Sequence, residues 1–472
     1  MRAKIEMFEG NADMNDRNYA RPLEYAFAFV TLFLMSGVLY GAFGLSTESS
    51  AGIGQSGLYK MVWATLYFLV GWMIALRFRL VLPVFAFNFP VTLFALAYLL
   101  SEIVNSDEHG DLIRLLSLYF TFAFCAWLAA VFSLEKIVRL LVYVMFAVIP
   151  VHVVNLILFG TKYGSDDVIQ RQTLLGFESL SGLFGHKNLA GLAFAVGVAL
   201  FLTLLLDRSQ RYNRKLLFAG LVLSGLCLLL TGAALAIIVV VVIFSVMIWM
   251  SSLNTRRAIW TNALGVVALC GAIAVAYDPD WALGLLGRSS DLTGRTVLWA
   301  WWSESFLEKP WIGYGYTGFF VPGGPVKILA SRLSLEGGIA NFHNSLLDIG
   351  IQTGVIGLSL FCLITALGLW RGAVVAIRSH HALTTFPFAV LVGLCVHAFG
   401  ESDIPLHNGF STVIFFTMFF KVSALYRNLQ RKPSRHRLRT TPSPLRPPEP
   451  RPAFLSGADR GTDKSANLPM VT

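Results

Sequence analysis

The chain has 472 residues, of which 56% are hydrophobic and only 14% are charged, and its mean hydropathy is +0.65. A soluble protein would carry about a quarter charged residues, so this composition excludes an ordinary soluble globular protein. The net charge of +10 lies mostly in loops and in the C-terminal segment, and it needs no nucleic-acid partner to explain it.

Apolar runs of about 20 residues recur along the chain, and each is long enough to cross a bilayer as a helix. Because backbone polar groups in lipid must be satisfied internally, these runs predict an all-α, polytopic membrane helical bundle of about twelve transmembrane helices. The pair within 215–251 is separated only by Thr231–Gly232, which leaves open whether it forms one helix or two. The runs lie near 25–45, 59–76, 80–101, 112–132, 138–160, 189–206, 215–232, 234–251, 258–277, 346–370, 383–400 and 409–427.

The charges of the loops predict how these spans are oriented. Lysine and arginine accumulate on cytoplasmic loops, and the even-numbered loops of this chain are the basic ones. Both termini are therefore expected in the cytoplasm, with a large extracytoplasmic loop at about 278–345. Residues 1–430 form the predicted transmembrane domain. Residues 431–472 are rich in Pro and Arg and predict a disordered cytoplasmic tail, which either contacts anionic lipid or a cytoplasmic partner or has no specific role.

The long loop is the longest hydrophilic stretch between spans, and it concentrates arginine, tryptophan, glycine and histidine. Its GYGYTG segment at Gly313–Gly318 matches a dinucleotide-binding pattern, but no βαβ unit surrounds it. We therefore expect these glycines to let the loop fold back over a site. Before it, Val297, Trp301 and Phe306 share one helical face, which predicts an interfacial helix or tryptophans that stack on sugar rings.

Four basic residues in the predicted outer loops run against the cytoplasmic bias of positive charge. A planar guanidinium matches phosphate oxygens and stays charged, so converging arginines would clamp a pyrophosphate. The alternative, equally weighted, is that each cation caps a helix or pairs with a nearby carboxylate. The four residues are Arg171, Lys187, Arg288 and Arg295.

His343 directly precedes an apolar span and has Asn344 beside it. A histidine in this position is more often a hydrogen-bonded interface residue than a catalyst. Neutral histidine is nevertheless the natural base for a hydroxyl near pH 7, and such a base contributes roughly 10²–10⁴ in rate. The chain contains no H-E-x-x-H, D-x-D or clustered Cys/His pattern, so we expect no metal site and no cofactor.

Five segments together resemble the O-antigen polymerase and ligase superfamily, and they are most similar to its exopolysaccharide branch of succinoglycan-type polymerisation proteins. The resemblance extends over nearly everything up to about residue 430. Each motif is short, and it is their order and their common side of the membrane that is specific. The segments are GLFGHKNLAG at 182–191, LLGRSSDLTGRTVLW at 285–299, EKPWIGYGYTGFF at 308–320, NFHNSLLDIGIQTGVIGL at 341–358 and GESDIP at 400–405.

The resemblance implies a GT-C-like, metal-independent glycosyltransferase of the bacterial inner membrane. It would act outside the cytoplasm on glycans linked to undecaprenyl pyrophosphate, polymerising exopolysaccharide repeat units, with a flippase and chain-length or export proteins as candidate partners. By the same resemblance, Arg171 and Arg295 would hold the pyrophosphate and His343 would activate the acceptor hydroxyl. Substrate binding would fall to Arg288, Lys187, Asn344 and Glu401.

One departure from the family pattern lies near Thr231–Gly232, where LLTGAALAI has no basic residue. Related proteins often carry a Ser-Arg or Ser-Lys there, so reduced activity or altered donor specificity stays open. Two other functions also stay open: a ligase that attaches glycan to another acceptor, and a polysaccharide or lipid transporter. Few ionisable residues fall at mid-membrane depth, which disfavours the transporter. A scaffold within a secretion complex is a further alternative.

Overall fold

The computed structural model describes residues 21–40, 57–105, 112–159, 180–207, 212–253, 295–321, 324–328, 339–379 and 381–431. The regular structure within these ranges is entirely helical, which confirms the all-α fold. The longer helices are α3 (Pro22–Met35), α4 (Gly57–Phe87), α5 (Phe89–Val104), α7 (Leu112–Val131), α8 (Leu134–Phe159), α9 (Lys187–Leu206), α10 (Arg214–Thr231), α11 (Ala234–Ser252), α14 (Arg295–Glu308), α16 (Ser345–Ser379), α17 (Ala382–Ala398) and α18 (Phe410–Arg431).

Eight of the described helices are long and apolar enough to cross a membrane: α4, α7, α8, α9, α10, α11, α16 and α18. Three shorter apolar helices, α3, α5 and α17, pack among them. The chain is therefore a multi-pass helical membrane protein. The expected span at 258–277 and nearly all of the expected tail, residues 432–472, lie outside the described residues.

The structure separates α10 from α11, which answers the question left open by the sequence. Gly232 adopts φ 62°, and its N–H donates to the Leu229 carbonyl at 3.2 Å. A glycine in the left-handed region is a common way for a helix to end. The two helices then part, since α10 packs mainly on α9 and α11 mainly on α17.

The boundary predicted between the runs at 59–76 and 80–101 coincides with a kink in α4 at Arg77, whose φ and ψ of −120° and 18° are not helical. At this kink the Arg77 guanidinium pairs with Glu24 of α3 at 2.7 Å. The run expected at 80–101 is not continuous, because α4 ends at Phe87 and α5 begins at Phe89. Between them, the amide nitrogen of the Asn88 side chain donates to the Val84 carbonyl at 2.8 Å.

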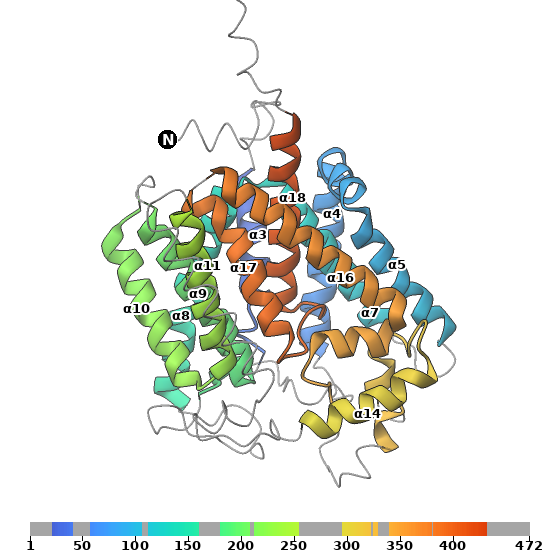
Figure 1. Ribbon diagram of the computed structural model, residues 1–472. Coiled ribbons are helices and arrows are strands. Elements are labelled where there is room, and N and C mark those ends of the chain that lie inside the picture. The colour runs from blue at the N-terminus through green and yellow to red at the C-terminus, as the bar shows by residue number, and fades with distance from the viewer. Residues whose placement is uncertain are drawn as a thin grey trace, which may run out of the picture. The chain divides into compact units, whose positions relative to one another are not determined.

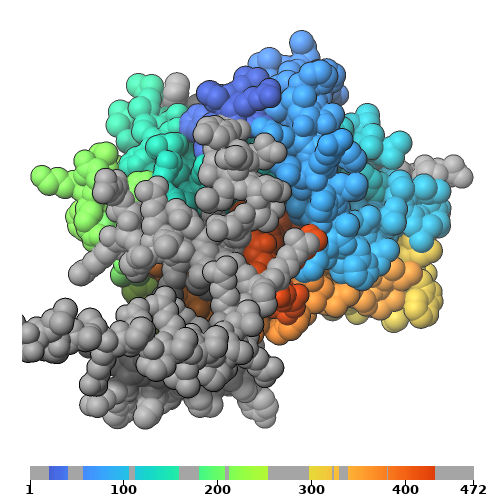
Figure 2. All heavy atoms as spheres, turned by 90° about the horizontal axis from the view of Figure 1, so that it is seen from above, coloured from blue at the N-terminus to red at the C-terminus, as the bar shows by residue number. Residues whose placement is uncertain are grey.

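Helix α17 connects two groups of helices. On one side α9 contacts α8, α10 and α11; on the other, α16 and α18 contact α5 and α7, as Figure 1 shows. Viewed from above, α10 (green) and α4 (blue) lie on opposite sides of the molecule (Figure 2). Large apolar side chains such as Phe68, Trp72 and Phe218 are exposed on these outer helices, which fits a surface that faces lipid.

Helix α16 is broken at Gly354, where φ is 65° and ψ is −166°. The carbonyls of Ile351 and Gln352 accept hydrogen bonds from Tyr314 N at 2.9 Å and Gly315 N at 3.1 Å. The GYGYTG segment thus closes onto the break. It holds the first part of α16, which begins at Ser345, at the same end of the bundle as α14 (Figure 1).

Candidate functional site

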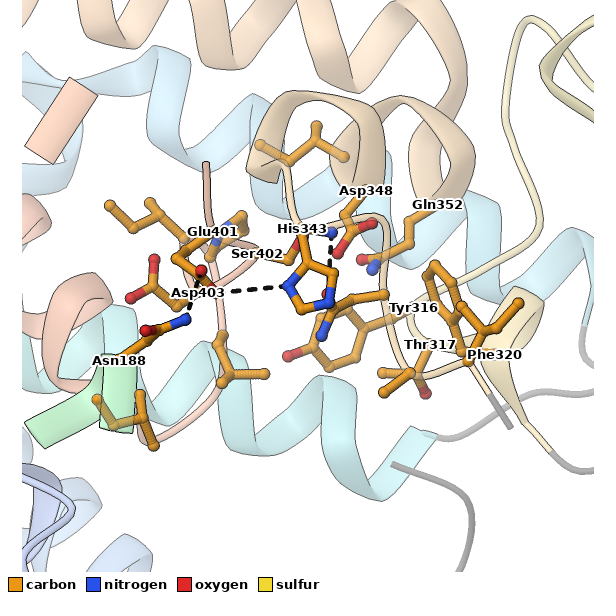
Figure 3. A pocket seen from close by; sticks show the side chains of 18 of the residues that line it. Asn188, Tyr316, Thr317, Phe320, His343, Asp348, Gln352, Glu401, Ser402 and Asp403 are labelled. Carbon is orange, nitrogen blue, oxygen red and sulfur yellow. Dashed lines mark hydrogen bonds and ion pairs between the residues drawn. The ribbon is translucent and has the colours of Figure 1, made fainter. Parts of the chain in front are cut away.

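A cavity of about 370 Å³ lies where α16 begins. Its walls come from α5, the start of α9, the loop after α14, the segment before α16 and the loop between α17 and α18 (Figure 3). Among the described residues that line it are histidines and carboxylates but no lysine or arginine. The ionisable ones are His186, His343, Asp348, His397, Glu401 and Asp403.

His343 lies in a turn that is stabilised by its neighbours Asn341 and Asn344. Its backbone is left-handed, with φ 51°, and its N–H donates to Asn341 Oδ1 at 2.9 Å. Asn344 Oδ1 then accepts from Leu346 N at 2.9 Å, which caps the N-terminus of α16. The expected substrate residue Asn344 therefore uses its side-chain oxygen to begin the helix, and this places the imidazole of His343 in the cavity.

Glu401 faces this imidazole from the loop after α17. Its Oε2 lies 3.6 Å from His343 Nδ1, and its Oε1 accepts from Asn188 Nδ2 at 2.6 Å. The Glu401 carbonyl also accepts from Ser345 Oγ at 2.8 Å. A carboxylate opposite Nδ1 favours the proton on that nitrogen, which leaves the Nε2 lone pair to act as a base.

A second histidine–carboxylate pair supports the loop that carries Glu401. His397 Nδ1 lies 3.3 Å from Asp403 Oδ1, and both side chains are buried. The His397 carbonyl accepts from Glu401 N at 3.0 Å. Asp403 belongs to the GESDIP segment, but sequence reasoning missed His397, although an ionisable residue inside an apolar run is itself a functional signal.

The GYGYTG segment forms one wall of the cavity, as its glycines predicted. Tyr316 N donates to Glu102 Oε2 at 2.8 Å, and Gly315 N donates to Ser101 Oγ at 2.9 Å. Tyr316 and Thr317 then line the cavity. Sequence reasoning missed Glu102 and Ser101 because they lie near the end of an apolar run.

Two tryptophans of α14 brace the segment that carries His343. Trp299 Nε1 donates to the Phe342 carbonyl at 2.9 Å, and Trp302 Nε1 donates to the Leu347 carbonyl at 2.7 Å. Of the three residues expected on one face of this helix, Trp301 and Phe306 are partly buried against an aromatic cluster, and Val297 is exposed. The choice between an interfacial helix and sugar stacking stays a prediction.

The structure describes only some of the predicted cationic residues. Arg171 and Arg288 lie outside the described residues, and of Arg295 only the backbone, at the first position of α14, is described. Leu298, one helical turn later, lines the cavity, so the start of α14 lies beside it.

Lys187 is the first residue of α9, between His186 and Asn188, which both line the cavity. His186 Nδ1 caps this helix by accepting from Asn188 N at 3.2 Å. Across the part of the chain that the structure describes, no group of three or more His, Cys, Asp or Glu side chains is placed to hold a metal ion.

Comparison with known proteins supports the resemblance seen in the sequence. A family model described as O-antigen ligase matches residues 219–362. The exopolysaccharide production protein ExoQ of Rhizobium meliloti (strain 1021) is 30% identical over 279 residues, which cover 55% of this chain and 61% of that protein. The chain is thus similar to proteins of the O-antigen polymerase and ligase superfamily. The match spans less than two thirds of the relative's length.

The family match includes the LLTGAALAI segment, which has no basic residue. Thr231 Oγ1 donates to the Leu228 carbonyl at 2.7 Å and accepts from Ala233 N at 3.2 Å. A Cβ on Gly191 would approach Ala233 Cβ to 2.5 Å. Small residues therefore let α9 pack tightly on the start of α11.

Proposed function

We propose that the protein transfers a glycan from a polyprenyl-pyrophosphate carrier to a sugar hydroxyl, and so polymerises exopolysaccharide repeat units. The observation that carries this proposal is the His343–Glu401 pair at a cavity that is also lined by aromatic and uncharged polar side chains. A base held by a carboxylate beside such a cavity suits the activation of an alcohol. The similarity to an exopolysaccharide production protein supports the polymer as the product.

The reaction proposed is a direct displacement. His343 Nε2 takes the proton of the acceptor hydroxyl while its oxygen attacks the anomeric carbon of the donor glycan. The bond from that carbon to the pyrophosphate oxygen breaks, and the carrier pyrophosphate leaves with the electron pair. The negative charge of Glu401, 3.6 Å from Nδ1, stabilises the imidazolium that forms. Attack opposite the leaving group inverts the anomeric centre.

The leaving pyrophosphate needs positive charge that the described lining of the cavity does not supply. We assign this role to Arg171 and Arg295, with Arg288 and Lys187 assisting in binding. The start of α14 beside the cavity supports Arg295. Preorganised donors of this kind contribute about 3–4 kcal/mol each to transition-state stabilisation. With arginines in this role the transfer proceeds without a metal.

The proposed setting is the outer face of the bacterial inner membrane, with both chain termini in the cytoplasm. The alternation of basic loops supports this orientation. Cysteines placed singly in the loop before His343 and in the C-terminal tail would test it, because only the former should react with an impermeant maleimide in intact spheroplasts. The opposite labelling pattern would reject the orientation.

The decisive experiment supplies purified protein in nanodiscs with a defined lipid-linked repeat unit. Polymer that grows equally with and without EDTA is the expected result. No glycan transfer by a folded wild-type protein, or transfer that stops with the chelator and returns with a divalent cation, would contradict the proposal. His343→Asn is the matched variant, because asparagine also tolerates the left-handed backbone at this position.

A ligase is the second candidate function, and the family model described as O-antigen ligase favours it. Deletion of the gene distinguishes the two. Loss of high-molecular-weight exopolysaccharide indicates a polymerase, whereas full-length chains that stay unattached to the cell envelope indicate a ligase.

A further inference from the structure

The two sides of His343 differ in chemistry. Figure 3 shows Glu401, Asp403 and Asn188 on one side of its imidazole, and Gln352, Thr317 and Phe320 on the other. The first side carries two carboxylates, and the second carries an amide, a hydroxyl and an aromatic ring. Asp348 also lies on the second side, where its Oδ1 accepts from Phe342 N at 3.0 Å. The proposed mechanism uses the first side and leaves the second without a role.

The second side holds hydrogen-bonding atoms that nothing in the described protein engages. Gln352 Oε1 and Thr317 Oγ1 are buried and have no hydrogen-bond partner, and neither does Tyr98 OH, which also lines the cavity. Gln352 is 8% exposed, and Tyr98 is fully buried. A buried polar atom without a partner costs about 1–3 kcal/mol. Three such atoms around one cavity indicate that a ligand supplies the missing partners.

The protein fixes these groups firmly in place. The Gln352 carbonyl accepts from Ser101 Oγ at 2.6 Å and from Gly315 N at 3.1 Å. The backbone that carries Gln352 is therefore bonded to the loop that carries Thr317. Thr317 itself adopts φ 62°, an unfavourable conformation for a β-branched residue. Such strain tends to persist at functional sites.

We propose that Gln352 and Thr317, with the rings of Tyr316 and Phe320, form the subsite for the acceptor sugar; this inference rests on the proposed glycosyl transfer. Amide and hydroxyl groups match the hydroxyls of a neutral pyranose, and aromatic rings pack on its apolar face. A pyrophosphate would require cations, which this side of the cavity lacks among the described residues. The sugar whose hydroxyl meets His343 Nε2 belongs to the acceptor.

The test uses full-length protein in nanodiscs, the native lipid-linked repeat unit as donor, and an alkyl glycoside of the same repeat unit as acceptor. The glycoside has no pyrophosphate, so it accepts but cannot donate. The variants are Gln352→Met, which keeps the shape of the side chain, and Thr317→Val. The control is Thr365→Val, which removes another unpartnered hydroxyl from α16 away from the cavity.

We expect Gln352→Met to raise the KM for the alkyl glycoside about tenfold and Thr317→Val to raise it about threefold to tenfold, since each removes one hydrogen bond. The KM for the donor and all values for Thr365→Val should stay within about twofold of wild type. An unchanged acceptor KM in both variants, or an equal rise for the donor, would overturn the subsite.

Failure of the proposed function has a different signature. If folded wild-type protein transfers no glycan, saturation-transfer NMR with the alkyl glycoside alone decides the subsite. Binding to wild type that weakens in Gln352→Met supports the subsite. No binding, or equal binding by both proteins, rejects it. Gln352→Glu serves as the second variant if the methionine protein does not fold.

Discussion

His343 Nδ1 and Glu401 Oε2 lie 3.6 Å apart, although 58 positions separate the two residues in sequence. Glu401→Gln keeps an oxygen for Asn188 but loses the charge that stabilises the imidazolium. We expect kcat to fall roughly 10²-fold or more while donor KM changes little. Single-turnover transfer rates measure this, with the exposed Glu304→Gln as control. Wild-type kcat in Glu401→Gln would remove Glu401 from the mechanism.

The tryptophans of α14 provide a second prediction. Trp299→Phe and Trp302→Phe together remove the donors to the Phe342 and Leu347 carbonyls. The segment between them should become more mobile, so kcat should fall about threefold to tenfold and amide exchange around residue 343 should accelerate. Trp311→Phe, at a ring that is 68% exposed, should change neither. Unaltered amide exchange in the double variant would show that the two tryptophan hydrogen bonds are not needed to hold this segment.

The break in α16 predicts a large effect on folding. A Cβ at Gly354 would lie 2.2 Å from the Trp311 carbonyl carbon, and φ 65° with ψ −166° is a region essentially restricted to glycine. Gly354→Ala should therefore destabilise the protein by more than about 4 kcal/mol, seen as a loss of monodisperse protein in detergent.

Gly225→Ala is the matched control for Gly354→Ala, because a Cβ there meets nothing within 4 Å. In a helix interior this change favours folding by roughly 0.5–1 kcal/mol. Equal yields and melting temperatures for the two variants would contradict the claim that the helix break at position 354 requires glycine.

His407 predicts how stability depends on pH. Burial and then the charge of Arg114 lower the pKa of His407 from 6.5 to about 4. The unfolded chain therefore binds a proton that the folded chain does not, and the unfolding free energy falls as the pH drops from 6.5 toward 4. His407→Gln, which cannot titrate but can accept from Tyr316 OH, should lose less melting temperature between about pH 7.5 and about pH 5. If wild type and His407→Gln lost equal melting temperature over this pH range, His407 would be excluded as the source of the pH dependence.

The sequence predicted the membrane bundle well because lipid imposes a length on each apolar run. It did not predict the contacts between distant segments. Arg77, at the kink of α4, pairs with Glu24 of α3, and nothing local in the sequence reveals that pair. The break at Gly354 was equally hidden, since its cause is the approach of Trp311 from another segment.

The sequence predicted individual residues of the candidate site, but it did not predict which of them come into contact. The motifs pointed to His343 and Glu401, but their pairing is a long-range contact that spacing does not encode. Gln352 and His397 were missed because they lie inside apolar runs, where polar residues look like isolated exceptions. It is their burial at the cavity that marks them as candidate site residues.

The backbone bonds at the α16 break also set an order for biosynthesis. Ser101 and Glu102 leave the ribosome first, the 313–315 loop that binds them follows, and the carbonyls at 351 and 352 come later. When each segment is made, its hydrogen-bond partner is thus already present. Its backbone N–H and C=O groups can therefore form hydrogen bonds as soon as the segment enters the membrane. Glu401 is made after all of these, followed by α18, which packs on α7, α16 and α17. A nascent chain that stalls before Glu401 would therefore lack both the carboxylate beside the base and this buried helix.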